Sequence, residues 1–170
     1  MPVYVALLRA VNVGGTGKLP MAELKAMCLE AGFSNVRTYI ASGNVMFTST
    51  LKIDQAKTRL EKRLQDYAGK PVGVIMRTAD ELAEVLRANP FPKAPPNRAV
   101  AIFLDTEPPS DALNTITGHR DEELSLGKRE IYVHYGNGMA DSKLKIPVAK
   151  SGTARNMNTV AKLVELTSAL

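Results

Sequence analysis

Two patterns of apolar positions alternate along the 170-residue chain and mark the predicted elements. Dense runs of Val, Ile, Leu and Phe are typical of strands, whereas apolar residues three and four positions apart are typical of amphipathic helices. Strands are expected at 3–11, 35–41, 44–48, 71–77, 98–105, 122–126 and 129–135. Helices are expected at 20–31, 53–68, 78–89, 108–116 and 155–170.

Residues that favour helix ends and tight turns stand at the borders of these segments. Pro20 suits the first position of a helix, where its missing N–H costs nothing. The sequence from Thr78 to Glu81 has the form of a capping box. Ser42-Gly43 is a two-residue turn between the second and third strands, so these strands are expected to form a hairpin.

The order of these elements predicts the fold. Residues 1–80 run strand, helix, strand, strand, helix, strand, which is the ferredoxin-like βαββαβ unit. Residues 81–170 repeat strand, helix, strand, strand and close with a helix, so the second half is an incomplete or modified copy in element order alone. We therefore expect an α+β protein with two ferredoxin-like halves and antiparallel sheets, arranged as two domains or as one compact unit.

Charge and composition narrow the class of protein. The chain has 22 basic and 17 acidic residues, a net charge of +5 and a pI of about 9.4. This surplus suits an anionic partner such as nucleic acid or a phosphorylated small molecule, while solvated surface charge explains it equally well. The single cysteine, Cys28, excludes an internal disulfide, and no apolar run approaches the ~18 residues of a membrane span. We expect a cytoplasmic protein without membrane contact and without a cofactor.

The first candidate site is the glycine-rich loop between the first strand and the first helix. It holds Gly14 and Gly15, and it is bordered by Arg9, Asn12 and Lys18. The loop matches neither the phosphate loop of NTPases nor the dinucleotide fingerprint, because the glycine spacing of both is missing. Backbone N–H groups and the two cations still favour an anion there. The alternative is an ordinary strand-to-helix loop.

Two further polar clusters stand on predicted turns. They are Ser42, Gly43 and Asn44 in the hairpin, and Ser142, Lys143, Thr153, Arg155 and Asn156 ahead of the last helix. Turn chemistry alone is the alternative explanation of the first cluster. A helix N-terminus beside Arg155 suits phosphate or carboxylate, and helix capping with solvated charge is the alternative for the second cluster.

No pattern of catalytic residues is recognisable. His119 and His134 are 15 residues apart without further ligands nearby, which argues against a metal site. Cys28 lies on the apolar stripe of the first helix and has no identifiable base, so it is expected in the core. The sequence leaves open whether the protein is an enzyme.

Three stretches of the chain form a recognisable set. They are Leu7-Leu-Arg-Ala-Val-Asn-Val-Gly-Gly15, Val36-Arg-Thr-Tyr-Ile-Ala-Ser-Gly-Asn-Val45 and Thr153-Ala-Arg-Asn-Met-Asn-Thr-Val-Ala-Lys-Leu163. Together they resemble a bacterial family, the domain of unknown function 1697 (DUF1697). The resemblance implies an α+β fold with two ferredoxin-like halves, and no established activity. Ala10 stands where the family usually has Gly, and Met157, which is expected to pack in the core, where it usually has Trp.

The leading hypothesis is a binding protein whose anionic ligand contacts all three polar clusters. The ligand would be a phosphorylated metabolite, a nucleotide or a nucleic acid. This hypothesis requires the opening loop, with Arg9 and Lys18, to meet Arg155 in one basic pocket or face. Aromatic residues make up only 5% of the chain, so a nucleic acid would be held through its phosphates rather than by base stacking. The alternatives are an enzyme acting on a phosphorylated or nucleotide-like small molecule, and a homodimeric scaffold without a small ligand.

Overall fold

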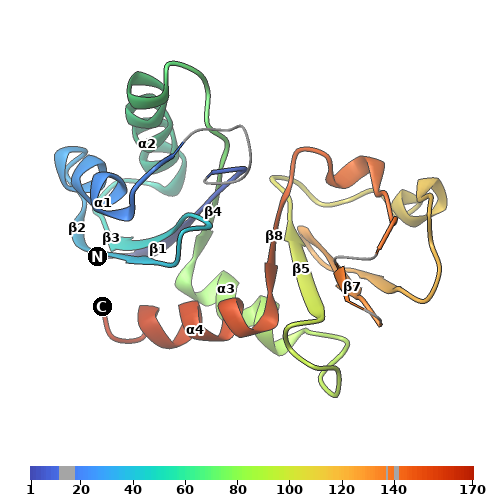
Figure 1. Ribbon diagram of the computed structural model, residues 1–170. Helices are drawn as coiled ribbons and strands as arrows, with labels where there is room; N and C mark the ends of the chain where they lie inside the picture. Colours follow the sequence, from blue (N-terminus) through green and yellow to red (C-terminus); the bar gives the residue numbers. More distant parts are fainter. Residues whose placement is uncertain (12–17, 137, 140–141) are drawn as a thin grey trace. The chain divides into compact units, whose positions relative to one another are not determined.

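The computed structural model describes residues 1–11, 18–136, 138–139 and 142–170 (Figure 1). These residues form an α+β structure with two four-stranded antiparallel sheets. The chain divides into two compact units, residues 1–82 with 163–170, and residues 83–162. Each unit holds one of the sheets and an apolar core of its own.

The first unit follows the predicted order of elements. Its strands and helices are β1 (Val3–Leu8), α1 (Met21–Glu30), β2 (Ser34–Tyr39), β3 (Asn44–Thr48), α2 (Ile53–Ala68) and β4 (Val74–Thr78). The strand order is β2-β3-β1-β4, so the strongly apolar β1 lies between β3 and β4. Every residue from Tyr4 to Leu8 is buried, as expected for a central strand that is covered on both faces.

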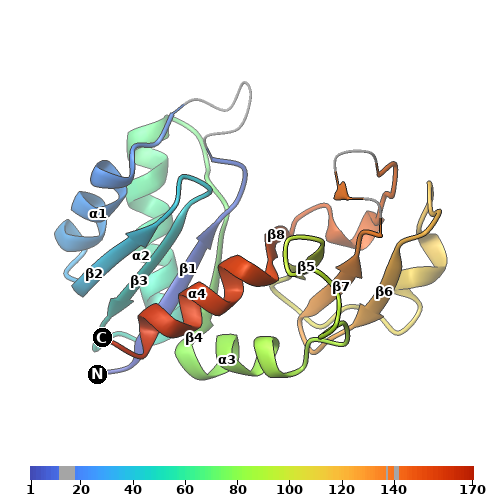
Figure 2. The same cartoon turned by 60° about the horizontal axis from the view of Figure 1, so that its bottom comes forward.

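Helices α1 and α2 cover one face of this sheet (Figures 1 and 2). Tyr4, Ala6 and Leu8 alternate along β1 and belong to one core cluster with Leu24 of α1 and Leu60 of α2. The removal of these side chains from water is the main force that holds the two helices on the sheet. The end of β1, where the chain leaves this core, is the region that positions the candidate site.

The second unit is built on a matching strand order. Its strands and 3-10 helices are β5 (Ala99–Phe103), η1 (Ala112–Thr115), β6 (Glu123–Leu126), β7 (Glu130–His134), η3 (Pro147–Ala149) and β8 (Thr153–Asn156). The order β6-β7-β5-β8 places β5 beside β7 and β8. An α-helix follows the last strand of each sheet, namely α3 (Ala79–Arg87) after β4 and α4 (Met157–Thr167) after β8.

Two predictions for the second half of the chain are wrong in part. The expected helix at 108–116 is only the four-residue 3-10 helix η1. The last helix begins at Met157 rather than at Arg155, because the preceding residues form strand β8 and pair with β5. Without β8, this edge of β5 would carry backbone N–H and C=O groups that lack partners, and burial of such groups is costly.

Candidate functional site

The end of β1 is held between two other segments of the first unit. The backbone N–H of Leu8 donates to the carbonyl of Gly43 at 2.8 Å, and that of Arg9 donates to the carbonyl of Gly73 at 2.9 Å. Gly43 belongs to the turn between β2 and β3, and Gly73 directly precedes β4. The structure therefore brings two of the predicted clusters, at Arg9 and at Gly43, to the same edge of the sheet.

Glycine is required at position 43 because the turn approaches β1 closely. Its φ is +91°, and a Cβ added there would lie 2.6 Å from Val11 Cγ2 and 2.8 Å from Leu8 Cβ. Asn44 is fully buried, and its Nδ2 donates to the carbonyl of Tyr39 at 2.8 Å and to Ser42 Oγ at 3.0 Å. These bonds fit the turn-forming alternative for the cluster, and a ligand-binding role for it stays a prediction.

Two non-glycine residues at this edge adopt left-handed backbone conformations. Ala10 has a φ of 54° and Ile40 a φ of 52°. A β-branched residue in this region is a rare outlier, and Ile40 is 47% exposed, so little burial of its side chain compensates. Such strain is found mainly at binding and catalytic sites, and Ala10 lines a pocket.

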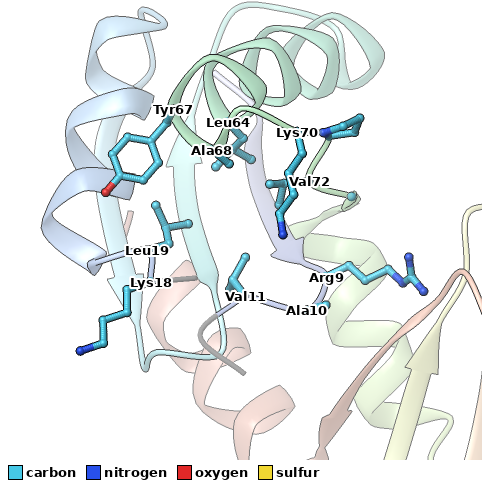
Figure 3. A pocket seen from close by; sticks show the side chains of 12 residues that line it. Arg9, Ala10, Val11, Lys18, Leu19, Leu64, Tyr67, Ala68, Lys70 and Val72 are labelled. Atoms are coloured by element: carbon cyan, nitrogen blue, oxygen red, sulfur yellow. The ribbon is translucent and has the colours of Figure 1, made fainter. Parts of the chain in front are cut away.

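This pocket has a volume of about 470 Å³ (Figure 3). It is lined by residues 9–11 directly after β1, residues 18–19 directly before α1, the end of α2 and the segment 70–73, and we call it the β1–α2 pocket. All of these segments belong to the first unit. Sites for small ligands have volumes of about 300–1,000 Å³, so the pocket is large enough for one.

The charged residues around the β1–α2 pocket are cationic. Arg9, Lys18 and Lys70 line it, and none of its lining residues in the described part of the chain is acidic. Lys70 points into the space between α2 and the end of β1, while Arg9 and Lys18 extend away on either side (Figure 3). Among the residues that the structure describes, neither lysine has an acidic partner. The resulting positive potential favours an anion at this place.

The wall of the pocket is apolar and includes one aromatic ring. Val11, Leu19 and Leu64 are buried, and Val72 packs partly buried against the same core. The ring of Tyr67 stands at the end of α2 (Figure 3), and this residue is 48% exposed. The pocket thus combines an apolar wall with a positive rim.

The remaining predicted site residues fall into two groups. Asn12, Gly14 and Gly15 lie outside the described residues. Ser142, Lys143, Thr153, Arg155 and Asn156 belong to the second unit. The predicted meeting of Arg9 and Lys18 with Arg155 in one shared site stays a prediction.

Arg155 is buried in a strand rather than presented by a loop. It lies in β8, is 6% exposed, and its Nη1 donates to Thr153 Oγ1 at 2.8 Å and to the carbonyl of Ala154 at 2.9 Å. Burial lowers the pKa of the Arg155 guanidinium to about 10, because the charged form is desolvated. The expected position of Arg155 beside open N–H groups at a helix start is wrong. Asn156 takes that place and caps α4 by accepting the N–H of Thr159 at 2.9 Å.

Ser142 has partners within the second unit. Its hydroxyl donates to the carboxylate of Glu122 at 2.5 Å and accepts the backbone N–H of Leu144 at 3.2 Å. The same carboxylate accepts the backbone N–H of Arg120 at 2.7 Å. The hydrogen bond from Ser142, followed by the one from Arg120, holds the pKa of Glu122 below its usual value. These bonds join the segment before β6 to the segment after β7.

Tyr67 and Lys70 are the pocket residues that the sequence analysis does not single out. Gly69 ends α2 with a φ of 72°, and Pro71 follows Lys70, so the chain turns away from the helix at this point. A lysine between a helix-ending glycine and a proline is the signal that could have drawn attention to the segment. Sequence spacing alone does not give the direction in which such a lysine points.

In the described part of the chain, the side chains that could bind a metal do not cluster, and the single thiol is buried. Among the described residues, no group of three or more His, Cys, Asp and Glu side chains could hold a metal ion. Cys28 is buried as predicted, and burial raises the pKa of its thiol to about 12, which disfavours the nucleophilic thiolate. In the same part of the chain, no helix has both the length and the apolar character needed to cross a membrane.

Comparisons with known proteins agree with the resemblance seen in the sequence. The family described as Protein of unknown function (DUF1697) matches residues 1–132. A solved structure, that of the conserved bacterial protein SP0830 from Streptococcus pneumoniae, is similar over 98% of each chain, with 25% sequence identity and a TM-score of 0.81. No curated protein matches the chain. These comparisons support the fold and bring no ligand or activity with them.

Proposed function

We propose that this protein, which belongs to the DUF1697 family, binds a small anionic ligand in the β1–α2 pocket. The observation that carries the proposal is the charge of the pocket, which is lined by three cationic residues and, in the described part of the chain, by no acidic one. A phosphate or carboxylate group would be bound by Lys70 inside the pocket, and the side chains of Arg9 and Lys18 would turn toward it from either side. The apolar wall would exclude water on the other side and so strengthen these contacts.

The charges are sufficient for a measurable affinity. A pair of unit charges ~4 Å apart gains about 1 kcal/mol in bulk water and about 4 kcal/mol near a protein surface. Arginine can bind two oxygens of a phosphate or carboxylate at once, whereas lysine acts as a point charge. With three such groups we expect a Kd between about 1 µM and about 1 mM for inorganic pyrophosphate, which corresponds to about −8 to −4 kcal/mol.

Calorimetric titration with inorganic pyrophosphate tests this proposal. Each of Arg9→Ala, Lys18→Ala and Lys70→Ala should weaken binding about fivefold, because each removes a contact worth about 1 kcal/mol. Lys62→Ala is the matched control, since Lys62 is an exposed lysine of α2 that does not line the pocket. It should change the Kd by less than about twofold, because screened charges act weakly at a distance. Absence of binding, or an equal loss in the control, would refute the proposal.

Nucleic acid is the second candidate ligand, and the net charge of +5 favours it. Phosphate contacts would then dominate, so a single-stranded oligonucleotide should displace pyrophosphate and its affinity should fall steeply as salt is added. The Lys70→Ala variant separates the two cases. An oligonucleotide that binds this variant as well as the unsubstituted protein uses another surface.

We further infer that both units are variants of the ferredoxin-like fold. In the first unit, the element order βαββαβ and the strand order β2-β3-β1-β4 support this description. In the second unit, the corresponding strand order supports it, with two 3-10 helices where the first unit has α-helices. An experimental structure with a different strand order in either sheet would overturn it.

A further inference from the structure

We propose that the ligand of the β1–α2 pocket carries a planar aromatic body next to its anionic group. This proposal rests on the proposed function and adds the chemical class of the ligand. The pocket has a positive rim and an apolar wall within one space of about 470 Å³. An inorganic anion would use only the rim, whereas an aryl phosphate, an aryl carboxylate or a nucleotide would use both surfaces.

Tyr67 makes the wall suitable for a ring. It is 48% exposed at the end of α2, and its ring lies beside Leu19 with the hydroxyl directed toward the side of Lys18 (Figure 3). An exposed aromatic face stacks on ligand rings of many kinds, because each ring has a π-face. Leu64 and Val72 extend the apolar surface on which such a ring would rest.

The dipoles of two helices make one side of the pocket more favourable for an anion than the other. Helix α1 begins at Met21, just after Lys18, so the positive end of its dipole lies on that side. Helix α2 ends at Ala68, where its last carbonyl groups disfavour an anion beside Tyr67. The anionic group is therefore placed toward Lys18 and the end of β1. The aromatic body is placed against Tyr67 and Leu64.

Three phosphate monoesters with the same charged group test the proposal. Methyl phosphate has almost no body, cyclohexyl phosphate has an apolar body that is not planar, and phenyl phosphate has a planar ring. Their affinities are measured by calorimetric competition with pyrophosphate. Phenyl phosphate should bind about tenfold more tightly than methyl phosphate and more tightly than cyclohexyl phosphate, as expected for stacking on one aromatic side chain.

Two variants of one residue then assign the effect. Tyr67→Phe keeps the ring and should preserve the tenfold preference for phenyl over methyl phosphate, whereas Tyr67→Ala should reduce it to about twofold or less. Tyr67 is about half exposed, so neither substitution removes a core residue. Circular dichroism and pyrophosphate binding report whether each variant keeps its structure and its anion site.

The outcomes separate the two proposals. Equal binding of methyl and phenyl phosphate, with pyrophosphate binding that still depends on Lys70, would overturn the aromatic class and leave the anion site in place. A phenyl preference that survives Tyr67→Ala, or equal binding of phenyl and cyclohexyl phosphate, would overturn the stacking role of the ring. A protein that binds neither pyrophosphate nor any of the esters would refute the proposed function and this inference together.

Discussion

In the first sheet Arg77 of β4 pairs with Val5 of β1, and in the second sheet Arg155 of β8 pairs with Ala101 of β5. Both arginines are buried, with exposures of 1% and 6%. Each donates from Nη1 to the carbonyl of the residue before it, and both distances are 2.9 Å. The buried arginine of β4 and that of β8 therefore make the same hydrogen bond to the backbone, although the two strands share little sequence.

The residue after each arginine caps a helix. Thr78 Oγ1 accepts the N–H of Glu81 at 3.1 Å, and the Glu81 carboxylate accepts the N–H of Thr78 at 2.9 Å, which confirms the predicted capping box. Asn156 accepts the N–H of Thr159 at the start of α4 in the same manner. The junction between the last strand of a sheet and the helix that follows it therefore has a side-chain cap in both places, at Thr78 and at Asn156.

The two units differ in the segments that link their strands. Between β1 and β2, and again between β3 and β4, the first unit has the helices α1 and α2. At the corresponding places the second unit has the 3-10 helices η1 and η3, which are four and three residues long. The β1–α2 pocket is lined by the residues directly before α1 and by the end of α2, and in the described part of the second unit the corresponding elements are 3-10 helices. The repeated sheet therefore supports the fold, whereas the segments that link its strands form the candidate site.

Removal of the two buried arginines is expected to have the largest effect. Arg77→Ala and Arg155→Ala should each lower the free energy of unfolding by about 3 kcal/mol or more, because each leaves a cavity and removes hydrogen bonds from a buried place. Urea denaturation measures both losses. Similar values are expected if the two junctions are equivalent, and a large loss at one position alone would break the comparison.

Gly43→Ala should have the next largest effect, and it concerns the first unit only. The added methyl group would collide with Val11 and Leu8, so we expect a loss of about 2–3 kcal/mol and weaker pyrophosphate binding. Gly69→Ala is the matched control, since Gly69 also has a positive φ of 72° but no atom within 4 Å of the added Cβ. It should cost about 1 kcal/mol. Equal losses in denaturation would show that close packing against β1 contributes nothing.

Relief of backbone strain should give a smaller change of opposite sign. Ile40→Gly and Ala10→Gly each allow a positive φ without a steric penalty, and we expect them to raise the free energy of unfolding by up to about 1 kcal/mol. Thermal unfolding measures the change. A stability gain accompanied by weaker anion binding in Ala10→Gly would show that the strain fixes the end of β1 for its ligand.

The smallest expected change is pH-dependent and concerns the second unit, whose linking segments rely on side-chain hydrogen bonds. The pKa of Glu122 is lowered in the folded protein from its ordinary value of 4.5, first by Ser142 and then by Arg120. The stability from this carboxylate is therefore present above that value and is lost as the pH falls through the folded pKa. Ser142→Ala should lower stability at neutral pH, and its difference from the unsubstituted protein should shrink in acid. A difference that stays constant across the pH range would contradict the linkage.

Sequence patterns predict most of the fold because burial imposes a period on the side chains. Val100, Ile102, Ile131 and Val133 alternate on strands β5 and β7 and form one core, as their spacing indicates. Met157 is 4% exposed, in agreement with the expectation that it packs in the core. Strand β8 was not predicted because apolar and polar residues do not alternate in Thr153-Ala-Arg-Asn156. Its pairing with β5 depends on the tertiary structure.

The candidate site was predictable only in part. Arg9 and Lys18 flank the glycine-rich loop in the sequence, and both line the pocket. Tyr67 and Lys70 reach the same pocket from the end of α2, about fifty residues later in the chain, and a helical period cannot show that the helix ends beside β1. The pocket is formed by contacts between segments that are distant in the sequence, and the pattern of apolar residues does not predict such contacts.

The first unit is made from two stretches of chain, residues 1–82 and residues 163–170, with the entire second unit between them in the sequence. During synthesis the ribosome therefore delivers the last piece of the first unit after every residue of the second unit has been made. Domains that emerge early usually fold early. In this protein the unit that begins first is completed last, and a fragment that stops at residue 82 would lack the segment that completes it.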